Sequence, residues 1–435
     1  MRHTAALRRR ILGHRATVGV VGQGYVGLSL ACAVAEAGFS VRGLDTDEGR
    51  AEDLAAGRLT VPGVAEDVFR SALAMGRMTF TANEEALEGC EVIAICVPTP
   101  VRNQAPDLSH VEEASRAVGR RLSPGSLVVL ESTTYPGTTE GLVAPILESS
   151  GLVAGRDFLL AYSPERIDPG NDEYGLRNTP RIVGGLTPEG TGAAALFYGQ
   201  IVDKVVVVSS AKAAELAKLL ENTFRHVNVA LVNEMAMLSH EVGIDVWEVI
   251  EATATKPFGF MPFRPGPGVG GNCIPVDPTY LAWQVRRDAG HQFRTLEQAQ
   301  DINAQMPAYV ATRIGDALND LGKPVKGSGV LVLGVTYKPD VGEIAESPSV
   351  KVMQQLVRRG ARVSFHDPLV DSVQVNGEVL ARADLTRRAV AGADCVALLT
   401  PHRTYDLDWI AQNAGLVFDA RNAVSPDRRE NVVRL

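Results

Sequence analysis

The sequence predicts an α/β protein of two doubly wound lobes joined by a long central helix and a helical middle region. Three observations carry this prediction. Short apolar strands alternate with helical stretches in both halves, each half opens with a strand, glycine turn, helix and strand ending in Asp, and one long segment between them lacks Gly and Pro. The 435 residues fit about two to four domains, and we place the boundaries at 1–209, 210–315 and 316–435.

The first lobe begins with the strand Thr17–Gly22, the helix Val26–Gly38 and the strand Ser40–Asp45, which together form a right-handed βαβ unit. The basic segment before it, MRHTAALRRRILGHR, has no apolar h-region, so we expect a floppy extension or a surface helix rather than a signal peptide. Further buried strands are predicted at Cys90–Val97, Ser126–Glu131, Phe158–Tyr162 and Val205–Val208.

The central segment 211–242 contains no Gly or Pro and is predicted to form one helix, about 48 Å long at 1.5 Å per residue. Apolar residues recur in it every three or four positions and form a broad stripe, which is typical of a helix that links domains or packs against a partner subunit. The stripe comprises Leu216, Leu220, Phe224, Val227, Leu231, Met235, Leu238 and Val242.

The second half repeats the pattern of the first without close sequence identity. After a loop rich in Pro and Gly at 256–278 and another helical stretch, the α/β alternation resumes, and a Rossmann-like arrangement is predicted for this lobe as well. Its elements are the strand Gly329–Gly334, the helix Ser349–Arg359, and the strands Ala361–Asp367, Asp394–Thr400 and Leu416–Asp419.

Composition and charge exclude several classes of function. Lys and Arg number 43 and Asp and Glu 51, and the net charge of −8 opposes general binding to nucleic acid or anionic membranes. No apolar run is long enough to span a bilayer. The five cysteines are irregularly spaced without a CxxC pair, which argues against a disulfide framework or zinc site and favours the cytoplasm. No histidine cluster has metal-ligand spacing.

A dinucleotide-binding turn is predicted at Gly22-Gln23-Gly24-Tyr25-Val26-Gly27, a GxGxxG pattern between the first strand and helix. Gly22 allows the tight turn, Gly24 admits the pyrophosphate, and Gly27 lets helix and strand pack closely. Asp45 ends the next strand, where it would bind ribose hydroxyls and repel a 2′-phosphate, so NAD is favoured over NADP. The alternative is an accidental glycine turn.

A candidate nucleophile lies in the loop Pro265–Pro278, PGPGVGGNCIPVDP. Its glycines remove side chains around one thiol, Cys273, so that backbone and sulfur can approach a ligand. The alternative is a small buried hydrophobe, which is the commoner role of cysteine and the one we expect for the other four.

Polar residues on the central helix and at two strand ends complete the candidate set. Lys218 and Asn222 are one turn apart and lie off the apolar stripe; alternatively, they belong to a solvated face with a Lys218–Glu221 pair. Ser132-Thr133 and the segment Ser163–Arg166 follow apolar strands, where open α/β sheets bind ligands, although ordinary turn chemistry explains each alone.

These motifs together resemble the UDP-glucose/UDP-mannuronate dehydrogenase family. The shared segments occur in order over residues 17–350 and are GQGYVG with Asp45, CVPTP, ESTTYPGTT, YSPER, AELAKLLENTFRHVNVALVNEM, PGPGVGGNCIPVDP and YKPDV with ESPS. The C-terminal segment DARN, Asp419–Asn422, fits the family as well. The residues of the SPER segment and of the cysteine loop are more similar to those of the branch that acts on UDP-N-acetylhexosamines.

The resemblance implies a four-electron, NAD-dependent oxidation of a sugar C6 alcohol to a carboxylate that consumes two NAD+. It implies that Cys273 traps the intermediate aldehyde as a thiohemiacetal and that the resulting thioester is hydrolysed. Lys218 and Asn222 resemble the donors to the C6 oxyanion, Asp277 with Thr133 resembles the pair that orders water, and Glu165 resembles the acid used in thioester hydrolysis.

The resemblance also implies the binding residues and a homodimer whose contact lies on the long helix. Positions for NAD include the glycine motif with Tyr25 and Val26, together with Asp45, Arg50, Thr99 and Thr133. Positions for the UDP-sugar are Glu165, Arg166, Lys218, Asn222, Arg264, Gly266, Gly270 and Lys338.

Two departures from the family pattern bear on substrate and cofactor. Asn272 stands where the branch usually has His before the cysteine, and Ala345 stands where an Arg commonly precedes ESP. Rival interpretations are a UDP-glucose 6-dehydrogenase, a dehydrogenase of a modified nucleotide sugar, and, in another class, a catalytically inactive protein that binds NAD and UDP-sugar.

Overall fold

The computed structural model describes residues 2–61, 64–168, 170–171, 173–271, 274–425 and 430–435. The chain forms two compact units. Unit 1 comprises Met1–Glu221 and Thr279–Ala289, and unit 2 comprises Asn222–Pro278 and Gly290–Leu435. Among the described residues, no helix combines the length and apolarity that a bilayer crossing requires.

Unit 1 is built on an eight-stranded sheet with the order β10-β9-β8-β7-β4-β1-β2-β3. Neighbouring strands are parallel except β8 and β9, which pair antiparallel. The order reverses beside β1, whose neighbours are β2 and β4, and this switch point is where open α/β sheets bind ligands. The strands are β1 (Thr17–Val21), β2 (Ser40–Leu44), β3 (Met78–Thr81), β4 (Val92–Ile95), β7 (Leu127–Leu130), β8 (Leu159–Tyr162), β9 (Arg181–Gly185) and β10 (Val205–Val207).

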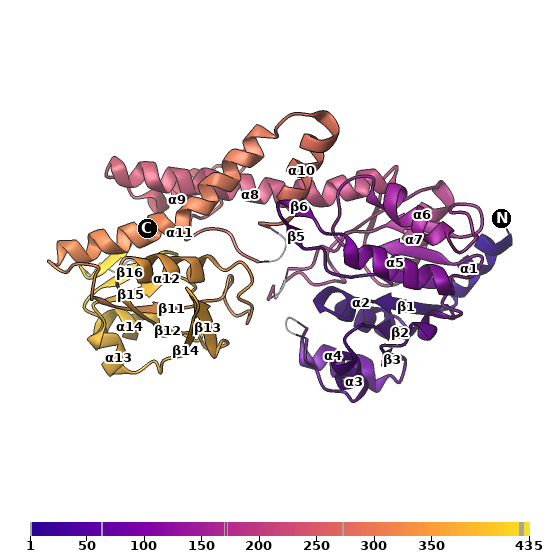
Figure 1. Ribbon diagram of the computed structural model, residues 1–435, viewed down its shortest axis with the longest axis horizontal. Helices are drawn as coiled ribbons and strands as arrows, with labels where there is room; N and C mark the ends of the chain where they lie inside the picture. The colour runs from indigo at the N-terminus through magenta and orange to yellow at the C-terminus, as the bar shows by residue number, and fades with distance from the viewer. Residues whose placement is uncertain (1, 62–63, 169, 172, 272–273, 426–429) are drawn as a thin grey trace. The chain divides into compact units, whose positions relative to one another are not determined.

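Helices cover both faces of this sheet because its strands are apolar on both sides (Figure 1). In β1, for example, Val18 and Val20 join one core and Val21 joins the other. The first core includes α1 (Arg2–Leu12), α2 (Tyr25–Glu36), α3 (Glu48–Ala55), α4 (Glu66–Ala74) and α7 (Pro188–Tyr198). The second includes η1 (Glu84–Leu87), α5 (Ser109–Arg121), η2 (Thr139–Val143) and α6 (Ala144–Glu148).

Of the two options for the basic N-terminal segment, the helix is correct. Leu7 and Ile11 of α1 are buried in the first core, and α1 packs against α7. A short antiparallel pair, β5 (Val101–Arg102) and β6 (Ala105–Pro106), lies in the connection after β4.

Unit 2 contains a five-stranded parallel sheet with the order β12-β11-β15-β16-β17. Helices α11 and α12 pack on one face, and α13 and α14 pack on the other (Figure 1). A hairpin, β13–β14, is attached to it. The bounds are β11 (Gly329–Leu333), β12 (Arg362–His366), β13 (Ser372–Val375), β14 (Glu378–Ala381), β15 (Cys395–Leu398), β16 (Val417–Asp419), β17 (Val432–Arg434), α11 (Arg294–Asp320), α12 (Pro348–Arg358), α13 (Arg387–Gly392) and α14 (Leu407–Asn413).

The predicted central helix is present as α8 (Ala211–Glu241), followed by α9 (Val246–Ala254) and α10 (Asp277–Ala289). Its apolar stripe is not buried within the chain: Leu220 is 62% exposed and Leu231 55% exposed. The buried face of α8 instead carries polar residues such as Glu215, Lys218 and Asn233. The two sheets and α8 together confirm the predicted fold of two doubly wound lobes joined by a long helix. The apolar stripe of α8 is exposed to solvent.

Candidate active site

The glycine turn after β1 contains two glycines that the protein's own packing requires. Gly22 has φ +88°, and a Cβ there would lie 2.6 Å from the carbonyl oxygen of Cys96. A Cβ at Gly27 would overlap the carbonyl oxygen of Gly22. At Gly24, by contrast, a Cβ would meet no atom within 4 Å. Packing leaves this space open at the N-terminus of α2, where a pyrophosphate can approach backbone N–H groups.

Asp45 closes this turn from the end of β2. Its buried carboxylate accepts hydrogen bonds from the backbone N–H groups of Gln23, at 2.7 Å, and Asp47, at 2.9 Å. Arg50 Nη1 lies 3.0 Å from the same carboxylate. The acid, the turn and the open space at Gly24 together fit a dinucleotide, with the acid placed for ribose hydroxyls.

The two glycines give a matched prediction. Gly24→Ala should leave the melting temperature unchanged, because its methyl group meets open space, yet raise the KM for NAD+ about tenfold or more by obstructing the pyrophosphate. Gly22→Ala should destabilise the fold by about 1–3 kcal/mol, because alanine is strained at this φ and contacts Cys96. Thermal unfolding and initial rates at varied NAD+ measure both; a large loss of stability in Gly24→Ala would contradict the prediction.

Other predicted cofactor residues occupy unit 1 near these strand ends. Tyr25 and Val26 are half-buried in the first turn of α2, and Thr99 is half-buried in the segment after β4. The carbonyl oxygen of Thr99 accepts a hydrogen bond from the hydroxyl of Tyr280 in α10. The backbone of Thr99 is thus tied to α10.

The carboxyl end of β7 carries the predicted Ser132-Thr133 pair. The Ser132 hydroxyl donates to the Val97 carbonyl oxygen at 2.8 Å and accepts from the Val97 N–H at 3.0 Å, which joins the ends of β4 and β7. Thr133 is half-buried. Its neighbour Thr134 is buried, and its hydroxyl has no hydrogen-bond partner among the described residues. Sequence reasoning missed Thr134, although it lies in the same polar run.

A buried ionic cluster fixes the carboxyl ends of β7 and β8. It was not predicted from the sequence. Glu131 forms an ion pair with Arg181 of β9 and accepts a hydrogen bond from the Tyr198 hydroxyl. The Arg181 guanidinium lies 4.4 Å from the Tyr198 ring centroid and donates through Nε to the Ser163 hydroxyl at 2.9 Å. The cluster fixes the residues that precede Ser132 and Glu165.

Lys218 is buried on α8 at the carboxyl end of β8. The residue is 5% exposed, its Nζ donates to the Glu165 carbonyl oxygen at 2.8 Å, and Nζ lies 3.7 Å from the Glu165 carboxylate. The alternative of a solvated face with a Lys218–Glu221 pair is therefore wrong. Glu221 pairs instead with Arg166, at 2.6 Å.

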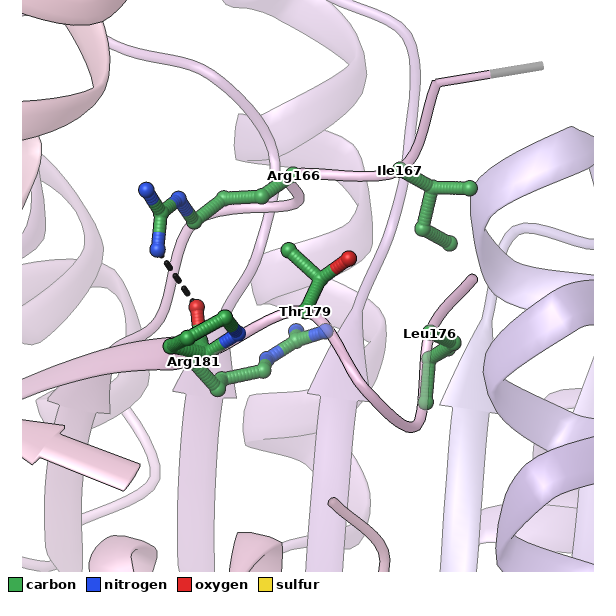
Figure 2. A pocket seen from close by; sticks show the side chains of 6 residues that line it. Arg166, Ile167, Leu176, Thr179 and Arg181 are labelled. Atoms are coloured by element: carbon green, nitrogen blue, oxygen red, sulfur yellow. Dashed lines mark hydrogen bonds between the residues drawn. The ribbon is translucent and has the colours of Figure 1, made fainter. Parts of the chain in front are cut away.

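Arg166 is engaged by the protein itself. Its guanidinium binds Glu221 and donates to the Pro180 carbonyl oxygen, beside a cavity lined by Arg166, Ile167, Leu176, Thr179, Pro180 and Arg181 (Figure 2). This cavity, about 10 Å³, is large enough for a single water and not for a sugar. The structure thus shows Arg166 bracing the segment after β8 against α8.

In unit 2, the backbone of the glycine-rich loop 266–271 packs directly against neighbouring residues, because its glycines carry no side chains. The Gly266 N–H donates to Asn233 Oδ1 at 3.0 Å, and a Cβ at Gly270 would lie 2.8 Å from the Cβ of Tyr337. The Gly271 N–H donates to the carbonyl oxygen of Ala345 at 3.0 Å. Asn272 and the predicted nucleophile Cys273 lie outside the described residues.

The other four cysteines are buried, as predicted. Burial raises the pKa of Cys32 and Cys395 to about 12 and that of Cys90 to about 11. It also raises the pKa of Cys96. None of the four thiols is therefore prone to ionise near neutral pH.

Two predicted catalytic residues of unit 2 contact each other. Asn222 Nδ2, on α8, donates to the carboxylate of Asp277, which is buried at the first position of α10. The remaining predicted cations of this unit differ in setting: Arg264 is exposed, and Lys338 is half-buried in the loop after β11.

Arg421 is a site candidate that was not singled out from the sequence. It follows β16, its Nε donates to the Leu399 carbonyl oxygen at 3.1 Å, and its guanidinium lies directly against Gly266. Burial lowers its pKa to about 10, while Asp419 opposes this shift. The arginine of the DARN segment was the available signal, and its contact with Gly266 required the fold.

Comparison with known proteins assigns the chain. Three models of the UDP-glucose/GDP-mannose dehydrogenase family match it in order: the NAD binding domain at residues 16–202, the central domain at 212–305 and the UDP binding domain at 331–426. Two curated relatives are the UDP-N-acetyl-D-mannosamine dehydrogenase of Pyrococcus horikoshii, 33% identical over 94% of this chain and 96% of that protein, and the UDP-N-acetyl-D-glucosamine 6-dehydrogenase of Pseudomonas aeruginosa, 37% identical over 82% and 83%.

A solved structure of the UDP-D-ManNAc dehydrogenase from Pyrococcus horikoshii superposes with a TM-score of 0.87 and 32% identity, covering 96% of this chain and 98% of that one. The cofactor predicted from the glycine turn and Asp45 agrees with the first domain model, which is an NAD-binding domain. The chain thus belongs to the UDP-glucose/GDP-mannose dehydrogenase family, the nucleotide sugar dehydrogenases to which its motifs pointed.

Proposed function

We propose that the protein oxidises the C6 alcohol of a UDP-N-acetylhexosamine, UDP-ManNAc or UDP-GlcNAc, to the uronate with two NAD+. Two curated relatives bear the names of dehydrogenases for these sugars. The observation that carries the proposal is the burial of Lys218 beside Glu165 at the strand ends of an NAD-binding lobe. Glu165 holds this ammonium group in place at the strand ends, where its positive charge is positioned to stabilise an alcohol oxygen that becomes an oxyanion.

The residues divide the chemistry among them. NAD+, which the turn Gly22–Gly27 and Asp45 would hold, would supply the hydride acceptor for the two oxidations at C6. As the hydride leaves C6, the C6 hydroxyl proton passes to water, while Lys218 and Asn222 donate hydrogen bonds to the C6 oxygen. Cys273 then adds through its sulfur to the aldehyde carbon, and the thiol proton moves to the former carbonyl oxygen, so that the aldehyde is held as a thiohemiacetal rather than released. Oxidation of that adduct leaves a thioester, and water then replaces the sulfur to give the carboxylate and the free thiol.

Water activation is assigned to Asp277 with Thr133, and Glu165 serves as the acid in hydrolysis. The contact between Asn222 and Asp277 supports the first assignment, since it fixes the orientation of a buried carboxylate.

Binding is assigned by lobe. Residues 1–209 bind NAD through the turn Gly22–Gly27, Asp45, Arg50 and Thr99, residues 210–315 carry the catalytic helix and loop, and residues 316–435 bind the UDP moiety. Arg264, Lys338 and Arg421 supply positive charge for the diphosphate, which an acidic protein must provide locally. Glu165, Arg166, Gly266 and Gly270 complete the sugar site, with Arg166 acting through its brace on α8.

A panel of nucleotide sugars tests the function. Purified enzyme with excess NAD+ should form two NADH for each UDP-ManNAc or UDP-GlcNAc consumed, with a uronate and no free aldehyde as product. Preference for UDP-glucose would overturn the substrate class, and a ratio near one NADH per sugar would overturn the two-step mechanism. Binding of both ligands without any NADH would favour the inactive binding protein.

We infer that the protein acts as a homodimer in the cytoplasm. All residues of the apolar stripe on α8 except Val227 are exposed, and monomeric proteins rarely expose a large contiguous apolar patch. A second copy is the partner that the stripe fits, because an apolar face can cover its own counterpart about a two-fold axis. The buried, unpaired cysteines support a reducing compartment.

Leu231→Asp should convert the dimer to a monomer, because a carboxylate in the centre of the stripe would be buried without a partner. Sedimentation velocity measures the mass. Val379→Asp is the matched control, since Val379 is an exposed apolar residue in β14, away from α8. A wild-type monomer, or an unchanged mass for Leu231→Asp, would contradict the dimer.

A further inference from the structure

His402 is a fully buried histidine of unit 2 whose ring contacts Asp367 on one side and the loop residue Asp340 on the other. It follows β15, and its side chain has no exposed surface. Nε2 lies 3.0 Å from Asp367 Oδ2, and the backbone N–H of Asp340 donates to Nδ1 at 3.0 Å. Because a backbone N–H only donates, Nδ1 carries no proton and the proton resides on Nε2. The contacts therefore place an acceptor, Nδ1, toward Asp340 and a donor, Nε2–H, toward Asp367.

Asp367 anchors one side of this arrangement. The carboxylate ends β12 and accepts hydrogen bonds from the backbone N–H groups of Val335, at 2.8 Å, and Leu369, at 2.9 Å, in addition to His402. Burial alone would raise the pKa of Asp367, but the hydrogen bonds from His402 and the backbone hold it below its ordinary value. The carboxylate is thus a fixed point of the sheet.

Asp340 forms the other side and belongs to the loop 336–346. It has φ +60°, which is strained for a residue other than glycine, and its carboxylate accepts from the N–H and Nε of Arg403 at 3.0 and 2.6 Å. The Thr336 hydroxyl donates to the Lys338 carbonyl oxygen at 3.0 Å. His402 and Arg403 therefore hold the loop in a strained conformation.

The same loop contacts the glycine-rich loop 266–271. Tyr337 packs against Gly270 and Gly271, where an added Cβ would lie 2.8 and 2.9 Å from its side chain. The carbonyl oxygen of Ala345 accepts the Gly271 N–H. A displacement of loop 336–346 would consequently move Lys338 and release two contacts of the glycine-rich loop.

We propose that His402 is a positioning residue for the nucleotide sugar: its Nδ1 holds Asp340, and with it the loop that carries Lys338 and supports Gly270 and Gly271. The consequence for substrate rests on the proposed function, whereas the hold on the loop does not. The competing role is purely structural, in which Nε2–H serves to satisfy the buried Asp367 carboxylate.

Two isosteric variants separate these roles. His402→Asn places an amide oxygen near the Nδ1 position and can still accept from Asp340, but it does not reach Asp367. His402→Gln places an amide N–H near the Nε2 position and can still donate to Asp367, but it offers Asp340 no acceptor. We expect His402→Gln to raise the KM for the UDP-sugar about tenfold and to leave the KM for NAD+ unchanged, while His402→Asn stays near wild type.

Hydrogen exchange of loop 336–346 is the readout that does not need activity. His402→Gln should exchange the amides of this loop faster than wild type, and His402→Asn should not. The opposite ranking of the two variants, or equal effects of both on exchange and KM, would overturn the positioning role. Wild-type protein that turns over no UDP-sugar would refute the proposed function alone, since loop exchange would still decide the role of His402.

Discussion

Cys273→Ser is expected to abolish net oxidation of the nucleotide sugar, with a fall in kcat of about 10³-fold or more. An alcohol at neutral pH is a far weaker nucleophile than a thiol, so the aldehyde would no longer be held for its second oxidation. Steady-state NADH formation measures the loss, and the wild-type yield of two NADH per sugar provides the reference. Retention of a tenth of the wild-type rate would refute the nucleophile.

Alkylation gives an independent measurement of the same thiol. The pKa values of Cys32, Cys90 and Cys395 are raised by burial to between about 11 and 12, so these thiols should resist iodoacetamide in the folded protein. We therefore expect one label per chain, located at Cys273, and loss of activity in proportion to labelling. Cys90→Ala is the matched control, because it removes a buried thiol and should leave both the label and the activity in place.

The nucleotide-binding turn was predictable because its signal is local. Gly22, Gly24 and Gly27 lie within six residues, and each is explained by backbone geometry or by space that the structure leaves open. The strand β9 was missed for the opposite reason. Its first residue, Arg181, reads as a surface charge, and only the distant Glu131 and Tyr198 make it a buried one.

The central helix shows a second limit of periodicity. The apolar stripe predicted one helix correctly, but its residues are exposed, while Glu215, Lys218 and Asn233 on another face are buried. Each buried group has a partner far away in sequence: Glu215 accepts from the N–H of Thr139, and Asn233 donates to Asn303. Hydrophobic periodicity does not predict a buried polar face whose groups are satisfied by tertiary hydrogen bonds, nor an apolar face that the chain itself leaves exposed.

Lys218→Met is expected to lower kcat by about 10²–10³-fold, the usual effect of removing one donor to a developing oxyanion. Methionine keeps the length and apolar contacts of the side chain and removes only the charge and the donor. Lys212→Met is the matched control on the same helix, because Lys212 is exposed and pairs at the surface with Glu140. That variant should retain wild-type kcat.

Because Lys218 is buried, the effect of its substitution on kcat must be measured separately from its effect on stability. Removing the ammonium leaves the Glu165 carbonyl oxygen without its donor and the buried Glu165 carboxylate without its cation, so Lys218→Met should also unfold at a lower temperature. Loss of folded protein would lower the rate in proportion to the folded fraction and would leave kcat per folded molecule unchanged. Lys218→Ala supplies the decisive measurement, since its smaller side chain makes room for an added amine. If the ammonium group acts on the C6 oxygen, ethylamine should restore part of kcat in Lys218→Ala without restoring its melting temperature; recovery of both together, or of neither, would assign Lys218 a structural role.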